Sequence, residues 1–144
     1  MITEINDLEL SSLLELYTEL GDNDIPKKDE SLKFIWESII SNKNYHIVVA
    51  KENNKIVSTC TVIIIPNLTH NQRPYAFIEN VVTSKEYRKK GYGTAVLNYA
   101  KEIAIKENCY KIMLLTGSKR ESTLNFYKKA GYNCNDKTAF IMWL

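Results

Sequence analysis

The chain has 144 residues, of which 44% are hydrophobic and 25% are charged, and its formal net charge is +2. This length is enough for one domain with a real core, and the small charge argues against nucleic acid as a partner. No apolar run approaches the ~20 residues that span a bilayer. The start, Met1–Ile5, lacks the basic residues and apolar core of a signal sequence. We therefore expect a single domain over residues 1–144, a cytoplasmic location, and neither a membrane nor a nucleic-acid partner.

The cysteines Cys60, Cys109 and Cys134 are odd in number and widely spaced. This pattern argues against a disulfide framework and against a zinc site, so we expect no metal. Cys60 lies in an apolar stretch, where cysteine usually acts as a small buried hydrophobic residue. A nucleophilic cysteine would need a base nearby, and His46 and His70 are the only histidines. We do not favour that chemistry.

The first half of the chain changes from helical to strand-like patterns. Apolar residues at steps of three and four predict two amphipathic helices, the first capped by Asn6 or Asp7 and ended by Gly21. Two later runs rich in β-branched residues, separated by Asn53-Asn54, predict an antiparallel hairpin. In chain order we expect a strand at Ile2–Ile5, a helix to Leu20, a polar loop at Asp22–Lys28, a helix at Glu30–Ser41, and strands at Tyr45–Lys51 and Lys55–Ile65.

The second half predicts strands joined by helices. A strand is expected at Tyr75–Thr83 and a short one at Lys111–Leu115. Because the helix Gly91–Lys106 joins them, the two should be parallel. A last helix at Arg120–Ala130 and a final apolar strand at Thr138–Leu144 complete the order. The fold class is therefore α/β with a mixed sheet, mostly antiparallel.

The run Arg88-Lys89-Lys90-Gly91-Tyr92-Gly93-Thr94 lies between a predicted strand and a predicted helix. The first N–H groups of a helix have no partner inside it, and the helix dipole places partial positive charge there. Glycines let the backbone approach a ligand closely. Such a run of lysines is often only a solvated turn, but the two glycines and the following helix favour a phosphate or pyrophosphate site.

Two motifs together resemble the GNAT superfamily of N-acetyltransferases. The first is Arg88-Lys89-Lys90-Gly91-Tyr92-Gly93, which matches the family pattern Arg/Gln-x-x-Gly-x-Gly/Ala after the fourth strand. The second is Phe126-Tyr127, followed by Gly131-Tyr132. The stretch Ile78-Glu79-Asn80-Val81-Val82 also looks like the glucosamine-phosphate N-acetyltransferase branch.

The resemblance implies a GNAT-like fold, with helices on both faces of the sheet and two parallel strands that splay apart at an acetyl-CoA site. Acetyl-CoA would be the co-substrate. Its pyrophosphate would lie on the backbone N–H groups of Arg88–Thr94. Its pantetheine arm would pair with backbone near Val81 and Val82, as an added strand would. Many relatives carry Asn where this chain has Thr123, which puts one pantetheine contact in doubt. The implied cofactor-binding residues are Val81, Val82, Thr83, Arg88, Lys89, Lys90, Gly91, Tyr92, Gly93, Thr94, Thr123 and Phe126.

Acetyl transfer from a thioester to an amine needs a neutral amine, a stabilised oxyanion and a proton for the leaving thiolate. Glu79, flanked by apolar and neutral residues, is our candidate base, acting directly or through a water. The alternative is a solvent-facing Glu paired with a lysine. The resemblance implies that Tyr127 is the acid, although a helical Tyr is often only part of the core. A backbone N–H near Val82 is the expected oxyanion donor.

The expected activity is acetylation of a primary amine on a small molecule. Two alternatives stay open: acetylation of a protein lysine or N-terminus, and a non-catalytic module that binds acyl-CoA. In this superfamily the acceptor pocket is formed by the first two helices and variable loops, here Leu8–Ser41 and Asn67–Pro74, and nothing in them names an acceptor. The apolar segment Thr138–Leu144 makes a homodimer plausible.

Overall fold

The computed structural model describes residues 1–21 and 23–144; Asp22, part of the predicted polar loop, lies outside the described residues. Within them one five-stranded sheet has the order β1-β2-β3-β4-β5. Neighbouring strands are antiparallel from β1 to β4, whereas β4 and β5 are parallel. The predicted mixed sheet, hairpin and parallel pair are thus confirmed. The strands are β1 (Ile2–Glu4), β2 (Tyr45–Glu52), β3 (Lys55–Ile65), β4 (Tyr75–Thr83) and β5 (Ile112–Leu114).

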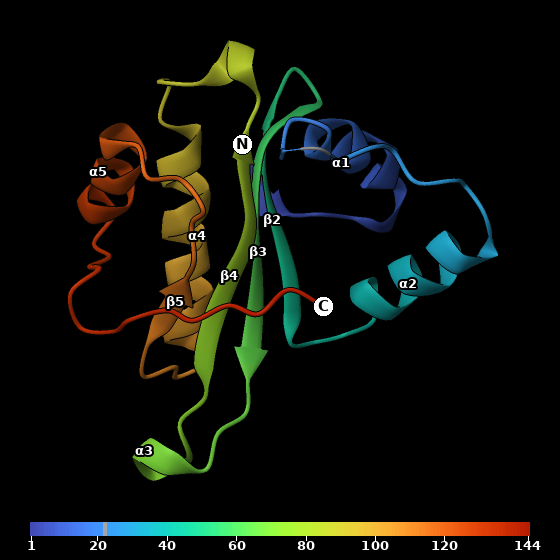
Figure 1. Cartoon of the computed structure of the whole chain (residues 1–144). Helices are drawn as coiled ribbons and strands as arrows, with labels where there is room; N and C mark the ends of the chain where they lie inside the picture. The colour runs from blue at the N-terminus through green and yellow to red at the C-terminus, as the bar shows by residue number, and fades with distance from the viewer. Residues whose placement is uncertain (22) are drawn as a thin grey trace.

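Helices cover both faces of the sheet, as expected (Figure 1). On one face α1 and α2 enclose a core with Leu13, Trp36 and Val49. On the other face α4 packs against Val48, Cys60 and neighbouring residues, with α5 outside it. The helices are α1 (Leu10–Tyr17), α2 (Glu30–Ile40), α3 (Thr69–Gln72), α4 (Tyr92–Lys106) and α5 (Glu121–Lys129), with short 3₁₀ turns η1 (Asp7–Glu9) and η2 (Lys85–Tyr87).

The 3₁₀ turn η1, which leads directly into α1, begins at the predicted cap Asn6. The Asn6 side chain accepts a hydrogen bond from the Leu8 N–H, and the Glu9 carboxylate accepts one from the Asn6 N–H, each at 3.0 Å. This reciprocal capping box satisfies N–H groups that a helix start leaves without partners. The α-helix ends at Tyr17, earlier than the predicted Leu20, and Gly21 follows with φ +68°.

The side chains of β4 switch from one face of the sheet to the other half-way along the strand. Ile78 packs into the α4 core but Val82 packs into the α1/α2 core, although residues four apart in a regular strand share one face. The β3–β4 register shifts between Thr59 and Thr61, and Asn80 has φ +52°. This irregularity is a β-bulge, which re-aims the side chains that follow it.

The parallel pairing of β4 with β5 is short. It covers Ala76, Phe77 and Ile78 on β4, and its last pair is Ile78 with Leu114. β4 continues to Thr83 beyond that pair. The edge of β4 from Glu79 to Thr83 is therefore not paired with β5, which leaves backbone groups on that side for a ligand. The Thr83 oxygen is an exception, because it accepts a hydrogen bond from the Arg88 Nε.

The prediction of a final strand at Thr138–Leu144 is wrong. This segment has no strand pairing, and Phe140 and Trp143 are 91% and 85% exposed. In Figure 1 the C-terminal stretch runs across the direction of the strands. An apolar run becomes a strand only where its backbone finds a neighbouring strand, and the tail meets none here.

The loop at 67–74 contains the short α3, in which His70 and Asn71 have left-handed backbones. Arg73 donates hydrogen bonds to the backbone oxygens of Asn108 and Cys109, at 3.1 and 2.9 Å. Its guanidinium therefore ties this loop to the connection between α4 and β5.

Candidate active site

The turn before α4 has the backbone that an anion site needs. Lys89 has φ +62°, and Gly91, the residue before the helix, has φ +85°. Gly91 supplies no side-chain cap, so the N–H groups of the first turn of this 15-residue helix are not covered by one. Lys89 and Lys90 are exposed beside them. The helix dipole and the lysines together favour a bound anion.

Arg88 and Lys90 are also anchored to their own loop. The Arg88 Nε donates to the backbone oxygen of Thr83 at 3.1 Å. The Lys90 Nζ lies 4.7 Å from the ring centroid of Tyr87, a cation–π contact. These contacts fix the path of the turn between β4 and α4.

Gly93 brings three of the predicted residues together. A Cβ on Gly93 would lie 3.1 Å from the Phe126 Cζ and 3.3 Å from the Thr83 Oγ1. Only glycine fits this approach without displacing a neighbour. The first turn of α4, the end of β4 and α5 therefore meet at one point.

Of the two predicted catalytic residues, Glu79 lies on the part of β4 that β5 does not pair, and Tyr127 lies on α5. Glu79 is exposed on β4 at the bulge, rather than enclosed by its apolar neighbours in sequence. Tyr127 is half-buried on α5, with its ring 5.0 Å from Phe126. Burial raises the pKa of Tyr127, and the neighbouring Cys60 and the negative charge of Glu79 raise it further. The phenol is thus held in its protonated form, which is able to donate a proton.

Cys60 is fully buried, and burial raises the pKa of its thiol to about 12. Its Sγ lies 3.5 Å from the Val96 backbone oxygen. A thiol so far from ionisation is a packing residue, as expected.

Three other predicted residues, Thr123, Tyr92 and Val82, lie on α5, α4 and β4. The Thr123 Oγ1 accepts a hydrogen bond from the Ser118 Oγ at 3.1 Å, at the start of α5. The Tyr92 hydroxyl donates to the Glu52 carboxylate at 2.7 Å. Val82 is buried, so its backbone and not its side chain is the part that a ligand can reach.

Sequence reasoning missed three residues near the site: Tyr17, Asn80 and Glu19. The Tyr17 hydroxyl lies 3.5 Å from the Thr61 Oγ1, and Asn80 lines the cavity between α1, α2 and the sheet. Glu19 binds the start of the β4–α4 loop. Asn80 did carry a signal, because asparagine within an apolar strand favours a left-handed bulge residue.

A model of the Acetyltransferase (GNAT) family matches residues 10–132. The chain belongs to this family. The solved structure of an acetyltransferase-like protein from Agrobacterium tumefaciens is 39% identical in sequence to this chain. Its TM-score is 0.92, and the match covers 100% of this chain and 99% of that one. The mixed sheet thus has its counterpart in the GNAT fold.

Curated GNAT relatives match over shorter stretches. Glucosamine 6-phosphate N-acetyltransferase of Trypanosoma brucei brucei is 32% identical over 83 residues, which is 58% of this chain and 54% of that protein. Streptothricin acetyltransferase A of Bacillus subtilis is 42% identical over 59 residues, which is 41% of this chain and 34% of that protein. This chain therefore spans only about half or less of the length of these relatives.

None of the helices that the structure describes is both long and apolar enough to cross a bilayer.

Proposed function

We propose that this protein is a single-domain N-acetyltransferase that moves the acetyl group of acetyl-CoA to a primary amine on a small molecule. The observation that carries this proposal is the meeting of the α4 N-terminus with the unpaired edge of β4, where Gly93 lies against Thr83 and Phe126. Membership of the GNAT family supports acetyl transfer.

Acetyl-CoA fits this arrangement in two parts. The diphosphate would lie against the N–H groups that follow Gly91, with Lys89 and Lys90 adding positive potential. The pantetheine arm would run along β4 and pair with backbone at Val81 and Val82, where β5 no longer pairs. The thioester then lies near the bulge.

The proposed chemistry is direct attack. Glu79 accepts a proton from the substrate ammonium, directly or through a water, and the neutral amine nitrogen attacks the thioester carbonyl carbon. A backbone N–H near Val82 stabilises the oxyanion. The intermediate collapses with cleavage of the C–S bond, and Tyr127 donates its proton to the thiolate. The amide nitrogen passes its extra proton through water to the Tyr127 phenolate, and Glu79 releases to solvent the proton that it took from the ammonium.

The direct test is release of CoA thiol from acetyl-CoA with a panel of amines. We expect Glu79→Gln and Tyr127→Phe each to lower kcat by about a hundredfold or more, with CoA affinity unchanged. Wild-type turnover in either variant would remove that residue from the mechanism. Binding of CoA without turnover of any amine would favour the alternative, a non-catalytic acyl-CoA module. Preference for a lysine-bearing peptide or a free N-terminus would favour the other alternative, a protein acetyltransferase.

We also propose that the protein forms a homodimer through its C-terminal segment. β5 is last in the strand order, so its outer edge lacks a strand partner in the described part of the chain. Residues 140–144 are apolar and exposed. An open strand edge and an exposed apolar segment in one molecule favour pairing with a second copy.

A further inference from the structure

A cavity opens on the α1/α2 face of the sheet, and the proposed function assigns no role to the residues that line it. Its volume is about 190 Å³. Its walls come from α1, α2, β2 and the bulge of β4, so one end reaches the residue next to Glu79. The lining residues are Leu10, Leu13, Leu14, Tyr17, Leu32, Ile35, Trp36, Ile39, Tyr45, Ile47 and Asn80.

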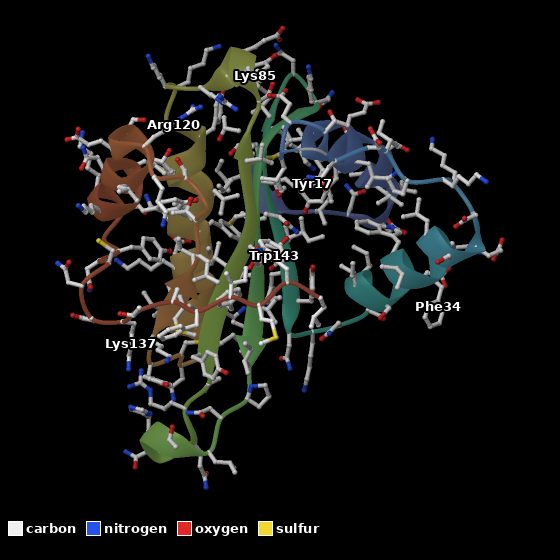
Figure 2. The ribbon with its side chains drawn as sticks, in the orientation of Figure 1. Tyr17, Phe34, Lys85, Arg120, Lys137 and Trp143 are labelled. Atoms are coloured by element: carbon white, nitrogen blue, oxygen red, sulfur yellow. The ribbon has the colours of Figure 1, made fainter. Side chains whose placement is uncertain are left out.

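The polar groups of this cavity are neutral. Two hydroxyls come from Tyr17 and Tyr45, and one amide comes from Asn80. The other lining residues are apolar apart from the indole N–H of Trp36. That N–H is used, because it donates to the Asp7 backbone oxygen at 3.0 Å. Figure 2 shows Tyr17 between α1 and the sheet. No lysine, arginine, aspartate or glutamate is among the described lining residues.

This composition selects between classes of acceptor. A phosphate or sulfate group would lose its hydration here without gaining a cation, which is strongly unfavourable. An apolar group would gain roughly 25 cal/mol for each Å² removed from water. The volume suits a group of about the size of a benzene ring, since an apolar cavity of roughly 150 Å³ is enough for benzene. Asn80, at the β4 end of the cavity, is the chain neighbour of Glu79, whose carboxylate complements an ammonium group.

We propose that the acceptor is a primary amine with a compact apolar aromatic or branched aliphatic group, which occupies the α1/α2 cavity while its amine lies at Glu79. This inference rests on the proposed function and names the substrate class of the same site. It separates this chain from enzymes whose acceptor is a phosphosugar.

The test compares three acceptors with the wild-type chain: phenethylamine, glucosamine 6-phosphate and a lysine-bearing peptide. The readouts are thiol release, and calorimetry of each acceptor with the CoA-bound protein, which does not depend on turnover. We expect phenethylamine to give a kcat/KM at least about tenfold above that of the other two.

A matched pair of variants on α2 tests whether the apolar group of phenethylamine lies in the cavity. Ile35 lines the cavity and is 51% exposed, whereas its neighbour Phe34 is 71% exposed, is not a lining residue and points away from the sheet (Figure 2). Both positions are open enough to accept serine without loss of the fold. Ile35→Ser should lower the affinity for phenethylamine by about tenfold, and Phe34→Ser should leave it unchanged.

Three results would overturn the inference. Equal or better use of glucosamine 6-phosphate or the peptide would do so while the proposed acetyl transfer stands. An equal response of phenethylamine to Ile35→Ser and Phe34→Ser would place its apolar group outside the cavity. The absence of both CoA binding and thiol release with every amine would refute the proposed function and this inference with it.

Discussion

At Tyr127, burial and the nearby negative charge of Glu79 act in the same direction. Both disfavour the phenolate, so the pKa of this tyrosine lies above its ordinary value of 10.0. A general acid must be protonated when the thiolate leaves. The surroundings of this single side chain therefore agree with the role that the family resemblance implies.

The raised pKa of Tyr127 predicts how kcat depends on pH in the alkaline range. Tyr127 stays protonated below its pKa, so kcat should not fall through its ionisation until the pH passes about 10. The measurement is kcat against pH for the wild type and Tyr127→Phe, with circular dichroism at each pH to confirm the fold. An alkaline fall below pH 9 in the wild type that disappears in the variant would contradict the assigned role.

At the scale of elements, Glu19 ties the segment after α1 to the turn before α4. Its carboxylate accepts hydrogen bonds from the Lys85 N–H at 2.7 Å and the Ser84 hydroxyl at 2.9 Å. Burial raises the pKa of Glu19, but these hydrogen bonds and the charges of Lys85 and Arg88 outweigh it, so the pKa is lowered. Figure 2 shows Lys85 on the loop that leads to α4.

Replacing Glu19 should therefore affect both stability and coenzyme binding. The charged form stabilises the fold above the ordinary pKa of 4.5, and this contribution is lost as the pH falls through the lowered folded-state value. Glu19→Gln should reduce the free energy of unfolding by about 1 kcal/mol at neutral pH, and the difference should vanish in acid. The KM for acetyl-CoA should rise severalfold with little change in kcat.

Urea unfolding at about pH 7 and about pH 3 measures the first effect, and steady-state kinetics measure the second. Glu15→Gln is the control, because Glu15 is an exposed glutamate on α1, four residues before Glu19. A loss of stability that is equal at both pH values, or equal in the two variants, would argue against the tether.

The elements that the sequence predicted well are those with strong local signals. The hairpin from Tyr45 to Ile65 has β-branched runs around an Asn-Asn turn, and both asparagines take left-handed backbones. The anion turn was recognisable because Gly91 and Gly93 lie beside lysines. The Glu19 contacts had no local signal, because they join residues 65 and 66 positions apart.

Local patterns could not specify the path of the tail, and they signalled the bulge only through Asn80. Whether β4 bulges at Asn80, and whether residues 138–144 pair, depends on neighbouring strands that local patterns do not specify. The apolar neighbours of Glu79 in sequence do not specify its burial, and the structure shows its side chain exposed.

At the scale of the whole molecule, the exposed C-terminal segment is the feature that a lone chain leaves unexplained. Phe140, Met142 and Trp143 are each more than 80% exposed, and Figure 2 shows Trp143 on this stretch. Contiguous exposed apolar residues usually mark an interaction surface.

If this segment joins two copies, its removal should yield monomers. We expect the full chain to sediment as a dimer, and a chain ending at Lys137 as a monomer. Trp143→Glu, which keeps the length, should weaken the dimer in the same direction and guards against misfolding of the truncated chain. A monomeric full chain at micromolar concentration would refute the dimer, and a truncated chain that stays dimeric would place the interface elsewhere.

The account as a whole depends on coenzyme binding at the start of α4, and calorimetry with CoA tests this most directly. The wild type should bind CoA, and Gly91→Val should weaken binding by about tenfold or more, because valine resists the φ of +85° that shapes the turn. Gly131→Val imposes a similar strain at φ +98°, after α5, and should leave the affinity unchanged. No heat with CoA, or equal affinities for wild type and Gly91→Val, would contradict the account.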